Sequence, residues 1–279
     1  MENKRICIIS PSLQMGGIER QLTILASHFV KRGHEVHFVA KHFYELDPQV
    51  KFIEPSFVHT SKASTKLFSY YKTISFLRKQ IKRIKPDTIM VFGDIINPIA
   101  LIANNGLGYP IYIADQISPE QNLGRFKNFM KRITYKKATG IIAQSKMAAD
   151  YKYEVFGKDI NVRIIPNTIR DIVDYPNAEK HLWVVALGRL SYEKGVDRLL
   201  DAFSRISEHE EWRLVLIGDG PERNRLEEQA KTLGIDNRVD FLGGRNDVDA
   251  LLAQCCIFVL PSRCEGFPNA LCEAMASPL

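Results

Sequence analysis

Short apolar runs alternate with amphipathic helical patterns along almost the whole chain of 279 residues. An apolar run bounded by turn residues is typical of a buried parallel strand, whereas apolar residues spaced by three and four predict a helix with one buried face. Repeated strand–helix units favour parallel sheets with helices on both faces, and this length suggests about two domains. We therefore expect an α/β chain with two doubly wound sheets. The expected strands are Lys4–Ser10, Val36–Ala40, Thr88–Phe92, Ile111–Ala114, Ile141–Gln144 and Arg163–Ile165, then Trp183–Leu187, Arg213–Ile217, Val239–Leu242 and Ile257–Leu260.

Charge is distributed unevenly between the two halves. Residues 1–176 hold 26 Lys and Arg against 15 Asp and Glu, whereas residues 177–279 hold 12 against 17. Such asymmetry indicates two domains with different partners. The polar segment 171–180, which contains Pro176, is the expected linker. We therefore expect an N-terminal domain over 1–170 and a C-terminal domain over 181–279.

The five cysteines are odd in number and form no Cys-x-x-Cys pair. This usage is typical of a reducing compartment and argues against structural zinc. No apolar run approaches the roughly 18 residues that a transmembrane helix needs. The start, MENKRICIIS, turns polar too quickly for a signal peptide. The sequence thus predicts a cytoplasmic protein without a metal or other cofactor.

Two glutamates, Glu265 and Glu273, are separated by seven residues in the stretch EGFPNALCE. Gly-Phe-Pro predicts a turn, and a helix is expected from Asn269, with Pro268 directly before it. Glu265 then lies on the loop after a strand, at the edge where open α/β sheets bind ligands. Glu273 lies one to two turns into the helix, whose N-terminus favours anions. Two ordinary glutamates on a solvated helix face are the alternative.

A second loop carries Arg189 and Lys194 between the strand Trp183–Leu187 and the amphipathic helix that follows. Arg binds phosphate through its planar fork and Lys binds it as a point charge, so the pair suits a diphosphate. Two exposed basic residues in a loop are the alternative. Gly218-x-Gly220 lacks a third glycine, and we interpret it as a strand-to-helix connection rather than a phosphate loop.

These segments, in this order, resemble the C-terminal half of the retaining glycosyltransferases of family 4, which have the GT-B fold of two Rossmann-like domains facing a cleft. GRLSYEKG is similar to the family's G-R-L-x-x-x-K-G, and EGFPNALCE to its E-x7-E signature. The resemblance covers about 1–279, more sharply after Val184. It implies that Arg189 and Lys194 grip the diphosphate of a nucleotide sugar. It also implies that Glu273 binds the ribose hydroxyls and that Glu265 lies by the transferred sugar. The implied donor site comprises Gly16, Gly17, Arg189, Lys194, Leu242, Glu265, Gly266, Phe267, Asn269, Ala270 and Glu273, with Glu265, Arg189 and Lys194 as its catalytic group.

The chain departs from the family pattern in its N-terminal half. Many members have a histidine by the reacting sugar, whereas the corresponding strand end here reads IADQISPEQ, where Asp115 or Gln116 would occupy that region. The acceptor-side catalytic residue therefore stays open. Asp247-Val248-Asp249 has the D-x-D form of a metal–diphosphate motif, but it opens a helix. We interpret its acidic residues as helix capping and expect no catalytic metal.

The segment Arg125–Lys137 places Phe126, Phe129, Met130 and Ile133 on one helical face, interleaved with six basic residues. A core-packed helix with a solvated basic face is one interpretation. The other is an interfacial helix on anionic lipid, or a groove for a polyanionic acceptor. A second basic helix in the same half favours lipid. No nucleic-acid-binding module is recognisable, so no nucleic acid is expected as a partner.

The sequence favours a metal-independent glycosyltransferase that moves a sugar from a nucleotide-diphosphate sugar, expected to be a UDP-sugar, to a glycan or lipid-linked acceptor in cell-surface glycan synthesis. A nucleotide-sugar epimerase of the same architecture and a non-catalytic nucleotide-sugar-binding subunit of a membrane complex are the alternatives. Family members continue beyond the helix of Glu273. We therefore expect the second domain to be truncated at Leu279, with the strand Ile257–Leu260 as an open edge and with low activity.

Overall fold

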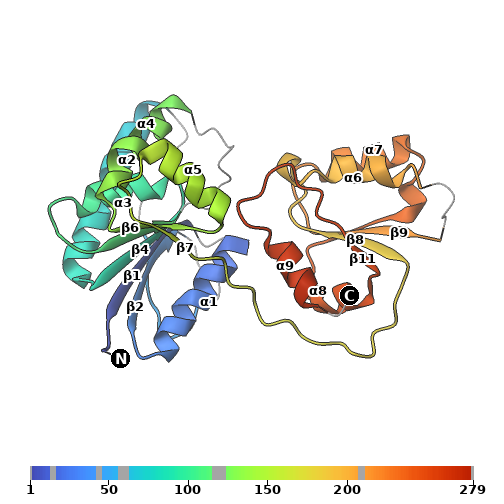
Figure 1. Ribbon diagram of the computed structural model, residues 1–279, viewed down its shortest axis with the longest axis horizontal. Coiled ribbons are helices and arrows are strands. Elements are labelled where there is room, and N and C mark those ends of the chain that lie inside the picture. Colours follow the sequence, from blue (N-terminus) through green and yellow to red (C-terminus); the bar gives the residue numbers. More distant parts are fainter. Residues whose placement is uncertain are drawn as a thin grey trace. The chain divides into compact units, whose positions relative to one another are not determined.

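The computed structural model describes residues 2–12, 17–41, 46–55, 63–114, 124–206 and 211–277. The chain divides into two compact units, Met1–Thr168 and Ile169–Leu279 (Figure 1). Each unit has its own parallel sheet with helices on both faces, which confirms the α/β class with two Rossmann-like sheets. The segment expected to be the linker, 171–180, contains neither helix nor strand.

Within the described residues, the sheet of the first unit has seven parallel strands in the order β3-β2-β1-β4-β5-β6-β7. The chain starts at the centre and winds outward in both directions, which is the doubly wound pattern. The strands are apolar because helices cover both faces. Strand β3 is missing from the sequence-based expectations, because three residues are too few to show a pattern. The strands are β1 (Arg5–Ser12), β2 (Glu35–Lys41), β3 (Lys51–Ile53), β4 (Thr88–Phe92), β5 (Ile111–Ala114), β6 (Gly140–Ala143) and β7 (Val162–Ile164).

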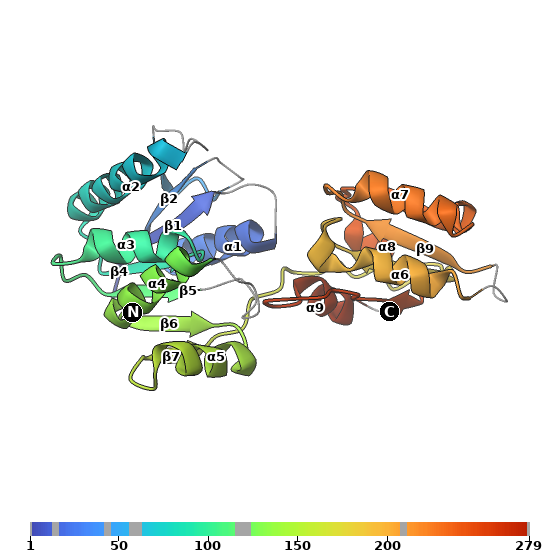
Figure 2. The same cartoon turned by 90° about the horizontal axis from the view of Figure 1, so that it is seen from above.

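Helices pack on both faces of this sheet. Leu22 and Ala26 of α1 pack on one face beside Phe38. On the other face, Ile81 of α2 packs beside Ile89, and Figure 1 shows α2 and α3 on the side of the sheet opposite α1; Figure 2 gives the view from above. Right-handed crossovers in opposite directions from β1 require this division. The helices are α1 (Gly17–Lys31), α2 (Ala63–Ile84), α3 (Ile96–Asn104), α4 (Arg125–Thr134) and α5 (Lys146–Phe156).

Helix α4 differs from the expected core-packed helix with a basic face. Phe129 and Ile133 lie four residues apart on one face and are 58% and 51% exposed. Lys131 instead pairs with the carboxylate of Asp94, which is buried. A buried carboxylate requires a cation, so the helix turns a lysine inward and two apolar side chains outward. That first interpretation is wrong for these residues.

The second sheet has the strand order β10-β9-β8-β11 in the part of the chain that the structure describes. Strand β11 pairs parallel with β8, as the doubly wound order predicts. It is shorter than expected, although the N–H of Val259 still bonds to the Val185 carbonyl. Pro261 follows and has no N–H to donate. The strands are β8 (Trp183–Leu187), β9 (Arg213–Ile217), β10 (Val239–Gly243) and β11 (Ile257–Phe258).

Helices cover both faces of the second sheet (Figure 1). Leu200 of α6 and Leu226 of α7 pack against Leu216 on one face. Leu252 of α8 and Ala274 of α9 belong to the cluster on the other face. The same winding thus places α9, which carries Glu273, directly after the edge strand. The helices are α6 (Val196–Phe203), α7 (Arg223–Thr232), α8 (Val248–Gln254) and α9 (Asn269–Ala276).

Candidate active site

The loops after β8 and β9 pack tightly together at the carboxyl edge of the second sheet. Gly218 has a φ of +130°, and a Cβ atom there would lie 2.0 Å from the carbonyl oxygen of Gly188. At Gly220 the corresponding distance to the carbonyl oxygen of Leu190 is 2.3 Å. Only glycine permits backbones to approach this closely. The Gly-Asp-Gly turn therefore joins β9 to α7 and also braces the loop that carries Arg189.

The structure brings Lys194 and Glu265 together from two loops 71 residues apart. The Lys194 Nζ lies 2.7 Å from Oε1 of Glu265. Ser262 Oγ donates a hydrogen bond to the same oxygen at 2.6 Å. The Lys194 and Glu265 side chains are 29% and 21% exposed, so both are shielded but reachable from solvent. A cation and a carboxylate are thus held at one point of the sheet edge.

Arg189 lies at the same edge, outside this ion pair. With Lys194 and Ser262 it lines a small pocket between the loops after β8 and β11. Its side chain is exposed, so the guanidinium fork can reach a ligand without being withdrawn from the core. The predicted pair of cations therefore does share one small region of the surface.

Arg263 holds the loop after β11 against the loop after β8. Its guanidinium donates to both carboxylate oxygens of Asp197, each at 2.6 Å, and lies 4.3 Å from the centre of the Tyr192 ring. Its backbone N–H bonds to the carbonyl of Glu193 at 2.8 Å. The hydrogen bonds from Arg263 hold the pKa of Asp197 below its ordinary value. This clamp sets the position of Glu265 relative to Lys194.

Glu273 lies in α9, where the spacing placed it, and its carboxylate has an unexpected neighbour. The Nε of Arg170 is 3.3 Å from Oε2 of Glu273. The guanidinium of Arg170 also donates to both carboxylate oxygens of Asp249. Asp249 accepts a further bond at 2.9 Å from the N–H of Val173. These hydrogen bonds to Asp249 raise the pKa of Arg170.

The acidic residues of the D-x-D sequence lie at the N-cap and in the first turn of α8, where they complement the helix dipole as predicted, but their side chains bind arginines. Asp247 occupies the N-cap position of α8 but makes no side-chain capping bond. It pairs with Arg245 at 2.8 and 2.6 Å instead. Asp249 lies in the first turn and binds Arg170. Arginine forks compete better for a carboxylate than a backbone N–H does, because the bond is between two charges.

The other predicted donor residues divide into two groups. Leu242 packs with the apolar cluster of α8 and α9. The segment from Gly266 to Asn269 leads into α9, and the N–H of Asn269 bonds to the carbonyl of Phe267. Ala270 is in the first turn of that helix, and Gly17 opens α1. The predicted residues Gly16, Asp115 and Gln116 lie outside the described residues.

Sequence reasoning missed Ser262 and Arg170. Ser262 stands three residues before Glu265, and the pattern Ser-x-x-Glu could have suggested a local hydrogen bond. No comparable signal exists for Arg170, which is 79 residues from Asp249. Only the tertiary fold brings those side chains into contact.

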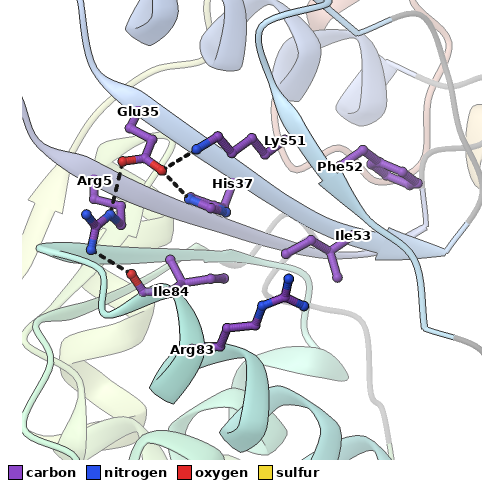
Figure 3. A pocket seen from close by; sticks show the side chains of 8 residues that line it. All are labelled: Arg5, Glu35, His37, Lys51, Phe52, Ile53, Arg83 and Ile84. Carbon is purple, nitrogen blue, oxygen red and sulfur yellow. Dashed lines mark hydrogen bonds and ion pairs between the residues drawn. The ribbon is translucent and has the colours of Figure 1, made fainter.

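A cavity of about 590 Å³ lies elsewhere, at the amino ends of the strands in the first unit. Figure 3 shows Glu35 among the lining residues, bonded to Arg5, His37 and Lys51 at distances of 3.1, 2.9 and 2.6 Å. Open α/β sheets bind ligands at the opposite edge. Arg5, His37 and Lys51 already share the Glu35 carboxylate, so we assign no ligand to this cavity.

Glu35 should make the stability of the chain sensitive to acid. Hydrogen bonds from Lys51, His37 and Arg5 lower its pKa from the ordinary 4.5 to about 2. Its contribution is complete above pH 4.5 and is lost as the pH falls towards 2. Glu35→Gln should cost about 1 kcal/mol at neutral pH, since solvent screens such exposed pairs. The difference in free energy of unfolding should shrink as the pH falls, as denaturant titrations at several pH values can measure.

The exposed residue Glu154 on α5 offers a matched control for this experiment. Glu154→Gln should change the free energy of unfolding by less at neutral pH. A difference between Glu35→Gln and the parent chain that stays constant from neutral to acidic pH would contradict the assignment.

Neither a metal centre nor a membrane span is found in the described ranges. No group of three or more His, Cys, Asp or Glu side chains there could hold a metal ion. No helix there is long and apolar enough to cross a membrane.

Two family models together match almost the whole chain. The model of Glycosyltransferase Family 4 matches residues 15–171, and that of Glycosyl transferases group 1 matches residues 168–279. The chain belongs to glycosyltransferase family 4. The two matches meet where the two compact units divide, at Thr168 and Ile169. The resemblance seen in GRLSYEKG and EGFPNALCE is thereby confirmed.

Relatives of this glycosyltransferase match almost its whole length. It is 30% identical over 278 residues to the GalNAc-alpha-(1->4)-GalNAc-alpha-(1->3)-diNAcBac-PP-undecaprenol alpha-1,4-N-acetyl-D-galactosaminyltransferase of Campylobacter jejuni, covering 97% of this chain and 76% of the relative. Sucrose-phosphate synthase from Thermosynechococcus elongatus has a similar structure, with a TM-score of 0.82 and 16% sequence identity. The match covers 98% of this chain and 79% of the synthase. HepE from Anabaena, solved in complex with UDP, has a TM-score of 0.73 and 20% sequence identity. That match covers 98% of this chain and 78% of HepE.

These findings confirm the GT-B fold and the glycosyltransferase activity that the resemblance implies. The roles of individual residues stay predictions. The structure nonetheless places Arg189, Lys194 and Glu265 around one point at the ligand-binding edge of the second sheet.

Proposed function

We propose that this glycosyltransferase moves a sugar from a UDP-sugar to a lipid-linked glycan acceptor, with retention of configuration and without a metal ion. The observation that carries the proposal is the contact between Lys194 and Glu265 beside Arg189. The name of the Campylobacter jejuni relative supports a lipid-linked acceptor, since that enzyme acts on a diphospho-undecaprenol glycan. The UDP complex of HepE supports the donor.

The chemistry follows from the charges at this edge. The bond between sugar C1 and the diphosphate oxygen breaks, its electron pair stays on the diphosphate, and negative charge grows there. Lys194 and Arg189 would stabilise that charge, which is often the largest catalytic contribution. Glu265 would lie on the sugar side, where positive charge develops at C1. Ser262 would keep Glu265 in place while Lys194 turns towards the diphosphate.

Nucleotide release from a panel of nucleotide sugars tests the proposal. The chain is incubated with UDP-, GDP-, ADP- and CDP-sugars, each with and without a diphospho-polyprenol glycan. We expect release of UDP that depends on the acceptor, together with a product of retained anomeric configuration. Isomerised sugar without any acceptor would favour the epimerase. Binding of a nucleotide sugar without turnover would favour the non-catalytic subunit.

A cytoplasmic enzyme with a lipid-linked acceptor would need to reach a membrane surface, and α4 offers a suitable face. Phe129 and Ile133 expose apolar side chains at a helical spacing of four residues. Arg132 and Lys136 are exposed on the same helical stretch, with spacings of three and seven residues from Phe129. Exposed apolar side chains flanked by cations are typical of helices that lie on anionic lipid. We therefore propose peripheral binding through α4.

Vesicle co-sedimentation checks this surface. The parent chain should bind phosphatidylglycerol vesicles better than phosphatidylcholine vesicles, and salt should weaken the binding. Arg132→Gln with Lys136→Gln should lose about 2 kcal/mol of binding, at about 1 kcal/mol for each cation near the surface. Arg225→Gln with Lys231→Gln, on α7 of the other unit, is the matched control and should bind like the parent. Equal binding to both vesicle types would remove the hypothesis.

A further inference from the structure

Arg170 makes contacts that its place in the chain does not explain. It belongs to the irregular segment before β8, yet its side chain is only 17% exposed. The Asp249 carboxylate is 10% exposed and the Glu273 carboxylate is 13% exposed. Two acidic side chains are therefore held close to one largely shielded guanidinium. Burying a charge is costly unless it is paired, so neither carboxylate would be stable here without a cation.

The two carboxylates are bound unequally. The fork of Arg170 is directed at Asp249, with one bond of 2.6 Å and a second to the other oxygen. Asp249 is itself fixed by the N–H of Val173 at 2.9 Å. The Nε of Arg170 lies 3.3 Å from Oε2 of Glu273, which is an ion pair without a hydrogen bond. Asp249 therefore takes the directed bonds of Arg170, while the Glu273 carboxylate is attracted to the same guanidinium through one oxygen and retains capacity to accept further bonds.

We propose that Arg170 is a positioning residue for the donor: with its fork fixed on Asp249, it holds the Glu273 carboxylate in the orientation that accepts the ribose hydroxyls. This inference rests on the proposed function, because it takes Glu273 as the ribose-binding residue. A carboxylate oriented in advance loses less side-chain freedom when the ligand binds, so affinity rises without a new contact. Asp249 then acts on the donor only through Arg170.

A double-mutant cycle on UDP affinity separates this role from a purely structural ion pair. Isothermal titration calorimetry with UDP is performed on the parent chain, Arg170→Gln, Glu273→Gln and the double variant. Both single variants should weaken UDP binding by about tenfold. The double variant should be no weaker than the weaker single variant, because both changes remove one coupled interaction. Arg170→Lys, which keeps the charge, should recover part of the affinity.

Arg213→Gln is the matched control. Arg213 donates to both oxygens of Asp240, at 2.8 and 2.7 Å, and thus also forms a bidentate pair in the second unit. It stands at the amino end of β9, away from the loops of the candidate site. This variant should bind UDP within twofold of the parent chain. If Arg170→Gln does not fold, the double substitution Arg170→Gln with Asp249→Asn takes the place of Arg170→Gln in the cycle. This double substitution removes one positive and one negative charge, so it leaves no unpaired carboxylate at Asp249.

Three results are decisive. UDP affinity of Arg170→Gln within twofold of the parent, or losses that simply add in the double variant, would overturn the positioning role of Arg170. If the parent chain binds UDP and either of those results is obtained, the proposal of a UDP-sugar donor still stands and only the role of Arg170 fails. A parent chain that binds neither UDP nor GDP, ADP or CDP would overturn the proposed function and this inference together.

Discussion

Replacing Lys194 with alanine should reduce kcat/KM for sugar transfer by about 100-fold or more, a loss of about 3 kcal/mol of transition-state stabilisation. The charge that grows on the leaving diphosphate would lose a shielded cationic partner, and the Glu265 oxygen would lose its ion pair and keep the hydrogen bond from Ser262. Arg189→Ala should have an effect of the same order, since Arg189 lines the same small pocket as Lys194. Glu273→Ala should mainly raise the KM for the donor. Steady-state kinetics with the donor varied measures all three.

Lys231→Ala controls for the loss of a lysine from the same unit, because its side chain is 64% exposed on α7. It should retain parental kcat/KM. Unchanged kcat/KM in both Lys194→Ala and Arg189→Ala would show that neither cation contacts the diphosphate. If kcat/KM fell only because the KM for the acceptor rose, the two residues would contact the acceptor rather than the donor.

Gly195→Ala should destabilise the second unit by about 3 kcal/mol and should also impair transfer. Gly195 has a left-handed φ of +65°, which costs a non-glycine residue roughly 1–2 kcal/mol. An alanine Cβ would also lie 2.2 Å from the carbonyl oxygen of Pro261, so the loop after β11 would have to move. That loop carries Ser262 and Glu265. Denaturant titration followed by far-UV circular dichroism measures the stability, and nucleotide release measures the activity.

Gly234→Ala separates the cost of the left-handed backbone from the cost of the close approach to Pro261. Gly234 has nearly the same φ, +68°, but among the described residues no atom beyond its own chain neighbours lies within 4 Å of the position that its Cβ would take. It should lose only the backbone contribution, about 1 kcal/mol, and should keep its activity. If Gly195→Ala and Gly234→Ala lose equal stability, then the close approach of Pro261 has no energetic consequence.

Local patterns predicted most of the secondary structure of the second unit. The strand bounds Trp183–Leu187 and Arg213–Ile217 follow from apolar runs ended by glycine, and the structure has the same bounds. Asn269 begins α9 directly after Pro268, as the turn sequence predicted. These predictions succeeded because both features are local in the sequence. A few neighbouring residues decide whether a parallel strand is buried on both faces, and a single proline removes an N–H.

Sequence patterns were less informative about which face of a helix is buried and which is exposed to solvent. The sequence of α4 shows a periodic apolar face but does not show what packs against it. The structure turns Phe129 and Ile133 outward because Lys131 is required inside, next to the buried carboxylate of Asp94. A buried charge that needs a partner outweighs the burial of two apolar side chains at this position. The partner is 37 residues away in sequence, so no local pattern could have shown it.

By itself, the sequence determined the alternation of strands and helices, the two units, the loops that carry Arg189, Lys194 and Glu265, and the helix that carries Glu273. Periodicity and turn residues act over a few positions, so they are legible along the chain. Only the tertiary structure decided that Glu265 is held by Lys194 and Ser262, and that Arg170 joins Asp249 to Glu273. Those contacts depend on how loops from separate strands converge at one edge of a sheet. Hydrogen bonds between charged groups act only over a few ångströms, so the fold must first bring the residues together.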